Sequence, residues 1–224
     1  MYKNQFSDLN KTYNNHLYSG FLGYLFKKNH LLMERNSNKL INNKNIVLEI
    51  GGGTHSHISY LQHPFEEYYS ADIDENNELA DFYKKNYPRI RYQKFDGKLL
   101  PYNDNFFDRI IISHCLEHVN NPENFLNEII RVCKMNGIVS IALPTDPGVA
   151  WRLGRFFIKK IIQKKTHNLS DIDYDYVNAI EHVNSIFSLR TILKKNFKII
   201  SEVYYPFNIR IADINLFYIV DIIK

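Results

Sequence analysis

Residues 47–56 read Val-Leu-Glu-Ile-Gly-Gly-Gly-Thr-His-Ser, and this stretch decides the fold. It begins as a short apolar run, typical of a buried strand, and continues into a glycine turn. Glycines let a backbone turn sharply and approach a ligand closely, because they carry no side chain. About twenty residues further on, a second short strand ends at Asp72, where a carboxylate can accept hydrogen bonds from a ribose. The pattern therefore predicts a site for an adenosine-containing cofactor.

Length and composition set the bounds of this prediction. A chain of 224 residues with 45% hydrophobic and 23% charged residues is typical of one soluble globular domain, which we expect to span residues 1–224. The net charge of +4 is too small to indicate nucleic-acid binding. The only cysteines, Cys115 and Cys133, lie in predicted core segments, which favours reduced packing thiols. Because the chain has neither a signal-peptide pattern nor a long apolar run, we expect a cytoplasmic location and no integral membrane segment.

Strand and helix patterns alternate from residue 46 onward, which predicts a parallel sheet with right-handed crossovers. The ending differs, because 197–205 and 216–223 read as two strands without a helix between them. We therefore expect an α/β, Rossmann-like doubly wound sheet of seven strands, mostly parallel, with an antiparallel final strand pair and N-terminal helices. The other predicted strands are 46–50, 68–73, 90–95, 109–113 and 138–143, and the predicted helices between them are 79–86, 123–133 and one that opens at 57–61.

The same pattern divides the chain into four parts. Residues 1–45 form a helical cap, and residues 46–145 form the cofactor-binding core. Residues 146–188 form an insertion or lid on the substrate side. Residues 189–224 form the C-terminal helix and the antiparallel strands.

Acidic residues and glycines follow the first three predicted strands, at the edge where parallel strands place ligands. Each piece alone is common in loops and caps, but their joint occurrence in register indicates a cofactor site. A carboxylate after the second strand suits ribose hydroxyls, and one after the third suits the adenine amino group. The residues are Glu49, Gly51, Gly53, Asp72, Asp96 and Gly97.

These motifs resemble the class I S-adenosylmethionine-dependent methyltransferases, in the small-molecule, type 11-like branch. The resemblance covers about residues 46–145, and it includes Leu100–Asp108, Ser113–Val119 and Glu128–Gly137. It implies S-adenosylmethionine as the cofactor and no metal. By this resemblance Glu49, Gly51 and Gly53 flank the methionine, Asp72 and Ile73 hold the ribose, Asp96 and Gly97 border the adenine, and Ser113 closes the pocket.

His55 departs from the family, which has a small residue at this place. The imidazole either donates a hydrogen bond to the carboxylate of the cofactor, or narrows the site, or points to solvent. The sequence leaves these alternatives open.

Methyl transfer from a sulfonium is an in-line displacement in which positioning supplies much of the rate. A hydroxyl nucleophile profits from a base, and histidine is the natural one. Of three candidates, His114, His118 and His182, we favour His118 and His182, because in the family the segments after the fourth and fifth strands face the methyl group. Asp146 ends the fifth strand and is a candidate for substrate binding, with a plain turn as the alternative.

Residues 151–165 predict a basic amphipathic helix with three interpretations: a solvated face over the substrate pocket, a patch for a phosphorylated substrate, or a peripheral membrane contact. The expected partner is a small-molecule acceptor, with phosphorylated and lipid-linked acceptors both left open. No nucleic acid is expected, since we find no recognition module. The oligomeric state is left open as well.

The predicted function is methyl transfer from S-adenosylmethionine to an oxygen or nitrogen of this acceptor. A non-catalytic cofactor-binding protein or partner subunit is one alternative. A nicotinamide-dependent oxidoreductase is a weaker one, because Ser56 stands in place of the third glycine of the dinucleotide fingerprint and Glu49 directly precedes the turn.

Overall fold

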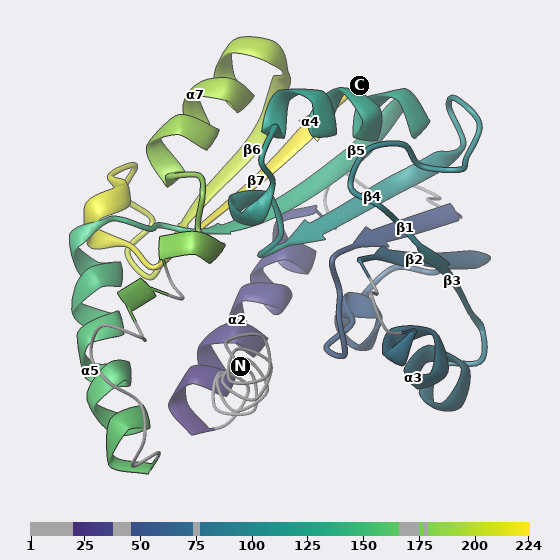
Figure 1. Cartoon of the computed structure of the whole chain (residues 1–224). Coiled ribbons are helices and arrows are strands. Elements are labelled where there is room, and N and C mark those ends of the chain that lie inside the picture. Colours follow the sequence, from purple (N-terminus) through teal and green to yellow (C-terminus); the bar gives the residue numbers. More distant parts are fainter. Residues whose placement is uncertain (1–19, 38–45, 74–76, 166–174, 177–178) are drawn as a thin grey trace.

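The computed structural model describes residues 20–37, 46–73, 77–165, 175–176 and 179–224, and Figure 1 shows their arrangement. The seven strands form one sheet in the order β3-β2-β1-β4-β5-β7-β6, as predicted. The strands are β1 Ile46–Ile50, β2 Glu67–Asp72, β3 Ile90–Lys94, β4 Phe107–Ser113, β5 Cys133–Pro144, β6 Lys198–Tyr205 and β7 Phe217–Ile223.

Strand directions confirm the predicted mixed sheet. β1 runs parallel to β2 and β4, and β4 runs parallel to β5. β7 inserts between β5 and β6 and is antiparallel to both. The helices are α2 Gly20–Ser37, α3 Glu78–Asn86, α4 Pro122–Val132, α5 Val149–Lys165 and α7 Ile186–Asn196, with 3₁₀ turns η1 His57–Tyr60, η2 Leu116–His118 and η3 Ala212–Ile214.

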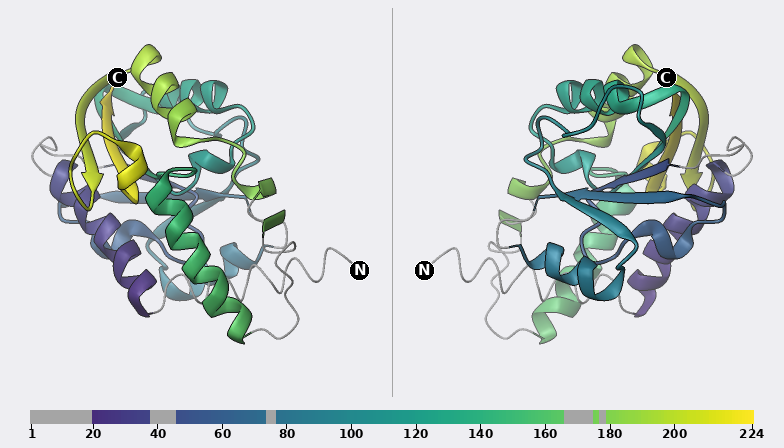
Figure 2. Two further views of the ribbon diagram at one scale, coloured as in Figure 1. Left: turned by 90° about the vertical axis from the view of Figure 1, so that its left-hand side faces the viewer. Right: turned by 90° about the vertical axis from the view of Figure 1, so that its right-hand side faces the viewer.

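Helices cover both faces of the sheet, with α4 and α7 on one side and α2 and α3 on the other (Figures 1 and 2). Alternate residues of the central strands supply the two cores. Leu48 and Ile110 join the core beneath α4 and α7. Val47 and Ile111 join Met33 of α2 in the other core. This two-sided burial explains why the central strands read as continuous apolar runs.

The helix predicted to open at 57–61 is wrong. Only the short 3₁₀ turn η1 forms there, and the chain then returns to β2. The glycine turn before η1 and Pro64 after it leave too few residues for a longer helix. Helix α2 packs against η1 instead, and the carboxylate of its Glu34 accepts a hydrogen bond from the backbone N–H of Gln62 at 2.9 Å.

Smaller corrections concern element ends. β3 stops at Lys94 and β4 already begins at Phe107. β5 begins at Cys133, because α4 passes directly into it without a loop. The two cysteines are free thiols, as expected. Residues 1–19 and 38–45 of the predicted cap, and residues 166–174 and 177–178 of the predicted insertion, lie outside the described residues. The predicted division of the chain therefore stays a prediction. Among the described helices, none is both long and apolar enough to cross a membrane.

Candidate functional site

The glycine turn after β1 lies against the segment that follows β4. Gly51 and Gly53 have positive φ angles of 74° and 51°, which favour glycine. The Gly51 N–H donates to the carbonyl of Ala71 at 3.0 Å and ties the turn to the end of β2. A Cβ at Gly51 would lie 2.8 Å from the Cβ of Cys115. The predicted cofactor turn and the segment after β4 are therefore in direct contact.

The Glu49 side chain, on β1 just before this turn, holds the turn in place by hydrogen bonds. Its buried carboxylate accepts hydrogen bonds from the Ser56 hydroxyl at 2.5 Å, the His57 backbone N–H at 2.7 Å and the Tyr68 hydroxyl at 2.8 Å. A Cβ at Gly52 would lie 2.6 Å from the Glu49 carboxyl carbon. The carboxylate thus faces the protein and fixes the turn, and its predicted contact with a cofactor stays a prediction.

Asp72 stands at the end of β2, as predicted, beside the glycine turn. Its Oδ2 accepts a hydrogen bond from the Gly53 N–H at 2.8 Å, and its Oδ1 accepts one from the Ile73 N–H at 2.7 Å. These two bonds orient the half-buried carboxylate beside the glycine turn, at the place where the sequence predicts the ribose.

Apolar side chains are exposed beyond the ends of β2 and β3. Ile73 is 63% exposed and Leu99 is 68% exposed. Between them in the sequence, the Asp96 Oδ1 accepts hydrogen bonds from the backbone N–H groups of Lys98 and Leu99, which lower the pKa of this carboxyl. Apolar side chains beside an acceptor suit the faces and the amino group of a purine. Sequence reasoning missed Leu99, for which the apolar Leu-Leu pair before Pro101 was the available signal.

The remaining predicted cofactor residues lie near the same edge. Gly97 has a φ of 80°, and a Cβ there would meet no atom within 4 Å. The Ser113 hydroxyl at the end of β4 is buried and has no hydrogen-bond partner among the described residues. His55 is exposed beside the Thr54 hydroxyl, with its Nδ1 at 3.1 Å. A buried free hydroxyl and an open glycine edge fit a bound adenosine cofactor.

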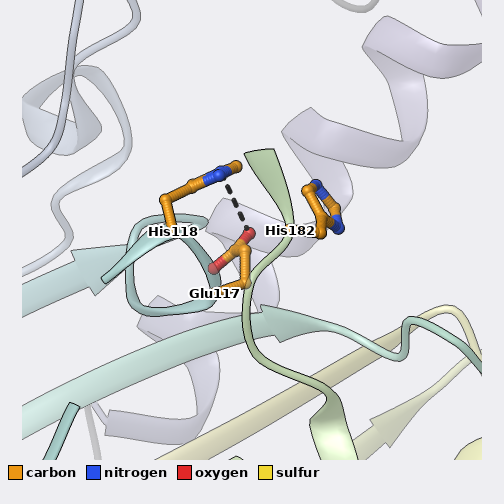
Figure 3. Close-up of side chains that lie close together, drawn as sticks. All are labelled: Glu117, His118 and His182. Atoms are coloured by element: carbon orange, nitrogen blue, oxygen red, sulfur yellow. Dashed lines mark ion pairs between the residues drawn. The ribbon is translucent and has the colours of Figure 1, made fainter. Parts of the chain in front are cut away.

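The segment after β4 also carries the first two residues of a second cluster, Glu117 and His118 on η2 (Figure 3). Glu117 is buried, with 2% of its surface exposed, whereas His118 is exposed. The His118 Nδ1 donates to the backbone carbonyl of Glu181 at 2.8 Å. This bond holds the imidazole against the C-terminal part of the insertion.

His182 lies across from His118, with ring centroids 5.0 Å apart. Its Nδ1 donates to the Oδ2 of Asp146 at 2.7 Å, and Arg155 of α5 forms an ion pair with the same carboxylate oxygen. Burial acts to raise the pKa of Asp146, but the His182 hydrogen bond and the Arg155 charge outweigh it and lower that pKa. An ionised Asp146 therefore orients His182, and its direct contact with a substrate stays a prediction.

Backbone and amide bonds fix this arrangement between segments distant in sequence. The Asn184 N–H donates to the Glu117 carbonyl at 3.1 Å, and the Asn184 side-chain amide donates to the Val119 carbonyl at 2.6 Å. The Ile186 N–H donates to the Asp146 carbonyl at 2.8 Å. Asn184, Arg155 and Glu117 were not predicted, although their positions beside the candidate histidines and in the basic segment offered a signal.

His114, the third candidate, belongs to the wall of the site. Its Nε2 accepts a hydrogen bond from the side-chain amide of Asn29 on α2 at 3.0 Å. Its ring packs edge-on against Phe26 and Phe217, with centroid distances of 5.1 and 5.4 Å. The structure therefore brings His118 and His182 together, whereas His114 contacts side chains of α2 and β7.

Helix α5 confirms the helix predicted at 151–165. Its exposed side chains include apolar ones, and some of its basic side chains form ion pairs within the protein. The apolar side chains of Leu153 and Phe157 are 57% and 63% exposed. Of the basic residues, Arg155 turns inward to Asp146, and Lys159 pairs with Asp175 at 2.8 Å. The three interpretations of this helix stay open.

Comparisons with known proteins point to one family. Residues 48–141 match the family model described as a methyltransferase domain. A demethylmenaquinone methyltransferase of Chlamydia caviae is 23% identical over 138 residues, which make up 59% of this chain and 60% of that protein. A ubiquinone/menaquinone biosynthesis C-methyltransferase of Pseudomonas fluorescens is 30% identical over 114 residues, 46% of this chain and 44% of that protein.

A solved S-adenosylmethionine-dependent methyltransferase from Aquifex aeolicus has a TM-score of 0.54 at 17% identity, with 83% of this chain and 85% of that chain covered. At this identity the likeness shows the fold. The alignments span less than two thirds of the length of the two curated relatives, at 60% and 44%.

Proposed function

We propose that this chain, whose residues 48–141 form a methyltransferase domain of the class I type, methylates a hydroxyl-bearing small molecule. The family match confirms the resemblance predicted from the sequence. S-adenosylmethionine is the cofactor that this resemblance implies. When bound, this cofactor supplies a methyl group on a positively charged sulfur. The acceptor and the roles of individual residues are our proposal.

The strand-end residues bind the cofactor on this proposal. Asp72 accepts from the ribose, since hydrogen bonds from the Gly53 and Ile73 N–H groups hold its carboxylate beside the glycine turn at the end of β2. Ile73 and Leu99 cover the adenine, and Asp96 borders it. The Ser113 hydroxyl closes the pocket toward η2. His55 stands at the open side of the turn, where its imidazole reaches the methionine end.

The observation that carries the choice of acceptor is the hydrogen bond between His182 and Asp146. The carboxylate can only accept, so the proton of a neutral His182 resides on Nδ1, and Nε2 keeps a lone pair. A neutral amine needs no base before it attacks, whereas a hydroxyl profits from one. The pair therefore favours an oxygen acceptor over nitrogen.

Methyl transfer to the hydroxyl oxygen moves one proton and one methyl group. The hydroxyl proton leaves the acceptor for a basic group of the site, and the oxygen lone pair forms the new bond to the methyl carbon. The carbon–sulfur bond breaks, and its electron pair stays on sulfur. Both an imidazole and a bound cation can promote loss of the hydroxyl proton in this arrangement.

A conjugated carbon is the second candidate for the methylated atom. The relative from Pseudomonas fluorescens is named a C-methyltransferase, and the one from Chlamydia caviae is named for demethylmenaquinone. Loss of a proton from a phenol-type hydroxyl makes the neighbouring ring carbon nucleophilic, so the same base serves carbon methylation. The acceptor class is then a hydroxylated aromatic compound.

Incubation of the protein with methyl-labelled S-adenosylmethionine and a small-molecule extract tests this function. We expect label in a product of the wild type, and at least about a tenfold loss in His182→Asn. Mass spectrometry of the product then separates an O-methyl from a C-methyl group. Cofactor binding without any labelled product would favour the non-catalytic alternative, and binding of a nicotinamide instead would favour the oxidoreductase.

A further inference from the structure

Three side chains in the second cluster lie close enough to share one cation. Glu117, His118 and His182 each offer one ligand atom, and these atoms lie within 4.8 Å of one another. Figure 3 shows Glu117 and His118 on one turn and His182 across from them. The set combines two imidazole nitrogens with one carboxylate oxygen, and residues 64 positions apart along the chain contribute to it.

Hydrogen bonds already determine which imidazole nitrogen is available. The partners of the two Nδ1 atoms are the Glu181 carbonyl and the Asp146 carboxylate, and both can only accept. Each Nδ1 therefore carries a hydrogen, and the Nε2 of each neutral ring keeps its lone pair. A histidine that binds a metal almost always donates its other ring N–H to a carbonyl or a carboxylate. Both histidines have this support before any ion is considered.

Glu117 is incompletely satisfied for a buried carboxylate. Its Oε2 is buried and has no hydrogen-bond partner among the described residues. Its Oε1 lies 3.8 Å from the His118 Nε2 and 3.6 Å from the His114 Nδ1, both beyond an ordinary hydrogen bond. A buried carboxylate oxygen without a partner is costly, so the arrangement calls for a cation or a donor between these groups.

We propose that Glu117, His118 and His182 bind a divalent first-row transition-metal ion. Mixed imidazole and carboxylate ligands suit manganese, iron, cobalt and zinc, whereas magnesium and calcium prefer oxygen ligands alone. Two ligands at about 2.1 Å from one ion lie at most about 4.2 Å apart. The 3.8 Å between Glu117 Oε1 and His118 Nε2 meets this limit. The ligand atoms of the whole set lie within 4.8 Å of one another, so a bound ion would have to draw the widest pair together by up to about 0.6 Å.

This inference rests on the proposed function and names how the acceptor hydroxyl loses its proton. Three protein ligands leave coordination positions open, and a hydroxyl oxygen that binds there becomes more acidic. In the metal-bound protein His182 is a ligand and does not serve as the base, so the hydroxyl proton passes to bulk water and the oxygen then attacks the methyl carbon. His118 and His182 act as ligands in this account, and Asp146 acts as a positioning residue for His182.

Cobalt(II) is the probe, because its visible absorption reports bound ligands directly. Titration of the metal-free, untagged protein with Co²⁺, followed by absorption and by calorimetry, should show one site per chain. Glu117→Gln and His118→Asn should each weaken it at least tenfold. Asp146→Asn should weaken it by about 10–100-fold, as loss of a supporting carboxylate typically does. Glu123→Gln, at an exposed position on α4, is the matched control and should bind as the wild type does.

Absence of a Co²⁺ site in the wild type, or equal affinity in Glu117→Gln and wild type, would overturn the inference. Thermal unfolding of each variant without metal establishes that it is folded. A parallel titration with S-adenosylmethionine separates the two proposals. Cofactor binding without a metal site refutes the metal alone, whereas failure to bind the cofactor refutes the proposed function.

Discussion

Glu34 and Glu117 are both buried carboxylates, but their surroundings differ in one respect. Glu34 on α2 has three partners: the Arg109 guanidinium at 2.7 Å, the His57 Nε2 at 2.8 Å and the Gln62 N–H at 2.9 Å. Glu117 on η2 has an oxygen without any partner among the described residues. A polar group that the protein satisfies fully stabilises the fold, and one that it leaves open is available for a ligand.

The contrast extends to the elements around each carboxylate. The Glu34 cluster lies inside the layer between α2 and the sheet, where Arg109 interrupts an otherwise apolar strand and is fully buried. The Glu117 cluster lies where β4 and β5 end, with His118 exposed to solvent. On our proposal, stability and ligand binding therefore depend on different parts of the molecule, and substitutions at the two clusters should affect different measurements.

The largest expected effect is on the Glu34 cluster. Arg109→Met should lower the free energy of unfolding by about 3–5 kcal/mol, because it leaves Glu34 as an uncompensated buried charge. Urea unfolding measures this change. Arg91→Met is the control, since its ion pair with Glu67 is exposed, and it should cost less than about 1 kcal/mol. Equal effects of the two substitutions would remove the distinction between buried and exposed pairs.

The pH dependence of unfolding tests the same cluster. Burial acts to raise the pKa of Glu34, but the His57 hydrogen bond and the Arg109 charge lower it from 4.5 to about 2. Because the folded pKa is depressed, this stabilisation is fully present above the unfolded value and is lost as the pH falls toward about 2. The loss should amount to roughly 3 kcal/mol in the wild type. It should be absent from Glu34→Gln, and parallel curves for the two proteins would contradict the account.

The glycine turn also contains one residue that is packed against the protein, Gly51, and one that faces open space, Gly53. Gly51 and Gly53 both have positive φ angles, but only a Cβ at Gly51 would collide with Cys115. Gly51→Ala should lower the free energy of unfolding by about 1–3 kcal/mol more than Gly53→Ala does. Gly53→Ala faces open space and should mainly weaken cofactor binding. Equal stability losses measured by urea unfolding would mean that Gly51 is not packed as described.

The smallest expected effect on the free energy of unfolding is that of a substitution at Glu117. Glu117→Gln should change the free energy of unfolding in the absence of metal by less than about 1 kcal/mol, because it removes a buried charge that lacks a full set of donors. Urea unfolding with Arg109→Met measured alongside is the test. A loss as large as that of Arg109→Met would place Glu117 among the groups that hold the fold together.

The sheet, and the positions of the glycine turn and Asp72 at its edge, could be predicted because their signals are local. A buried parallel strand reads as an apolar run, and the glycines and Asp72 follow the strands directly. The helix expected at 57–61 failed although local signals were present, because the glycine turn before it and Pro64 after it leave too few residues for a longer helix. The packing of α2 against the short turn η1 could not be predicted, since α2 comes from the N-terminal part of the chain.

The polar clusters were harder to predict, because the residues in each cluster are distant from one another in the sequence. Arg109 inside an apolar strand required a buried anion, but nothing in the sequence marked Glu34 on α2 as that partner. His118 and His182 were predicted individually, whereas their proximity to Glu117 depends on Asn184, whose side-chain amide binds the Val119 carbonyl 65 residues away. Residue type predicted the candidates, and only the folded chain determined which of them meet.

Calorimetric titration with S-adenosylmethionine tests the central claim most directly. The account predicts one binding site in the wild type. It also predicts a loss of about tenfold to a hundredfold in Asp72→Asn, because the acceptor of the ribose hydrogen bonds loses its charge. Asp81→Asn, at an exposed position on α3, should bind as the wild type does. No binding by the wild type, or equal affinity in all three proteins, would contradict it.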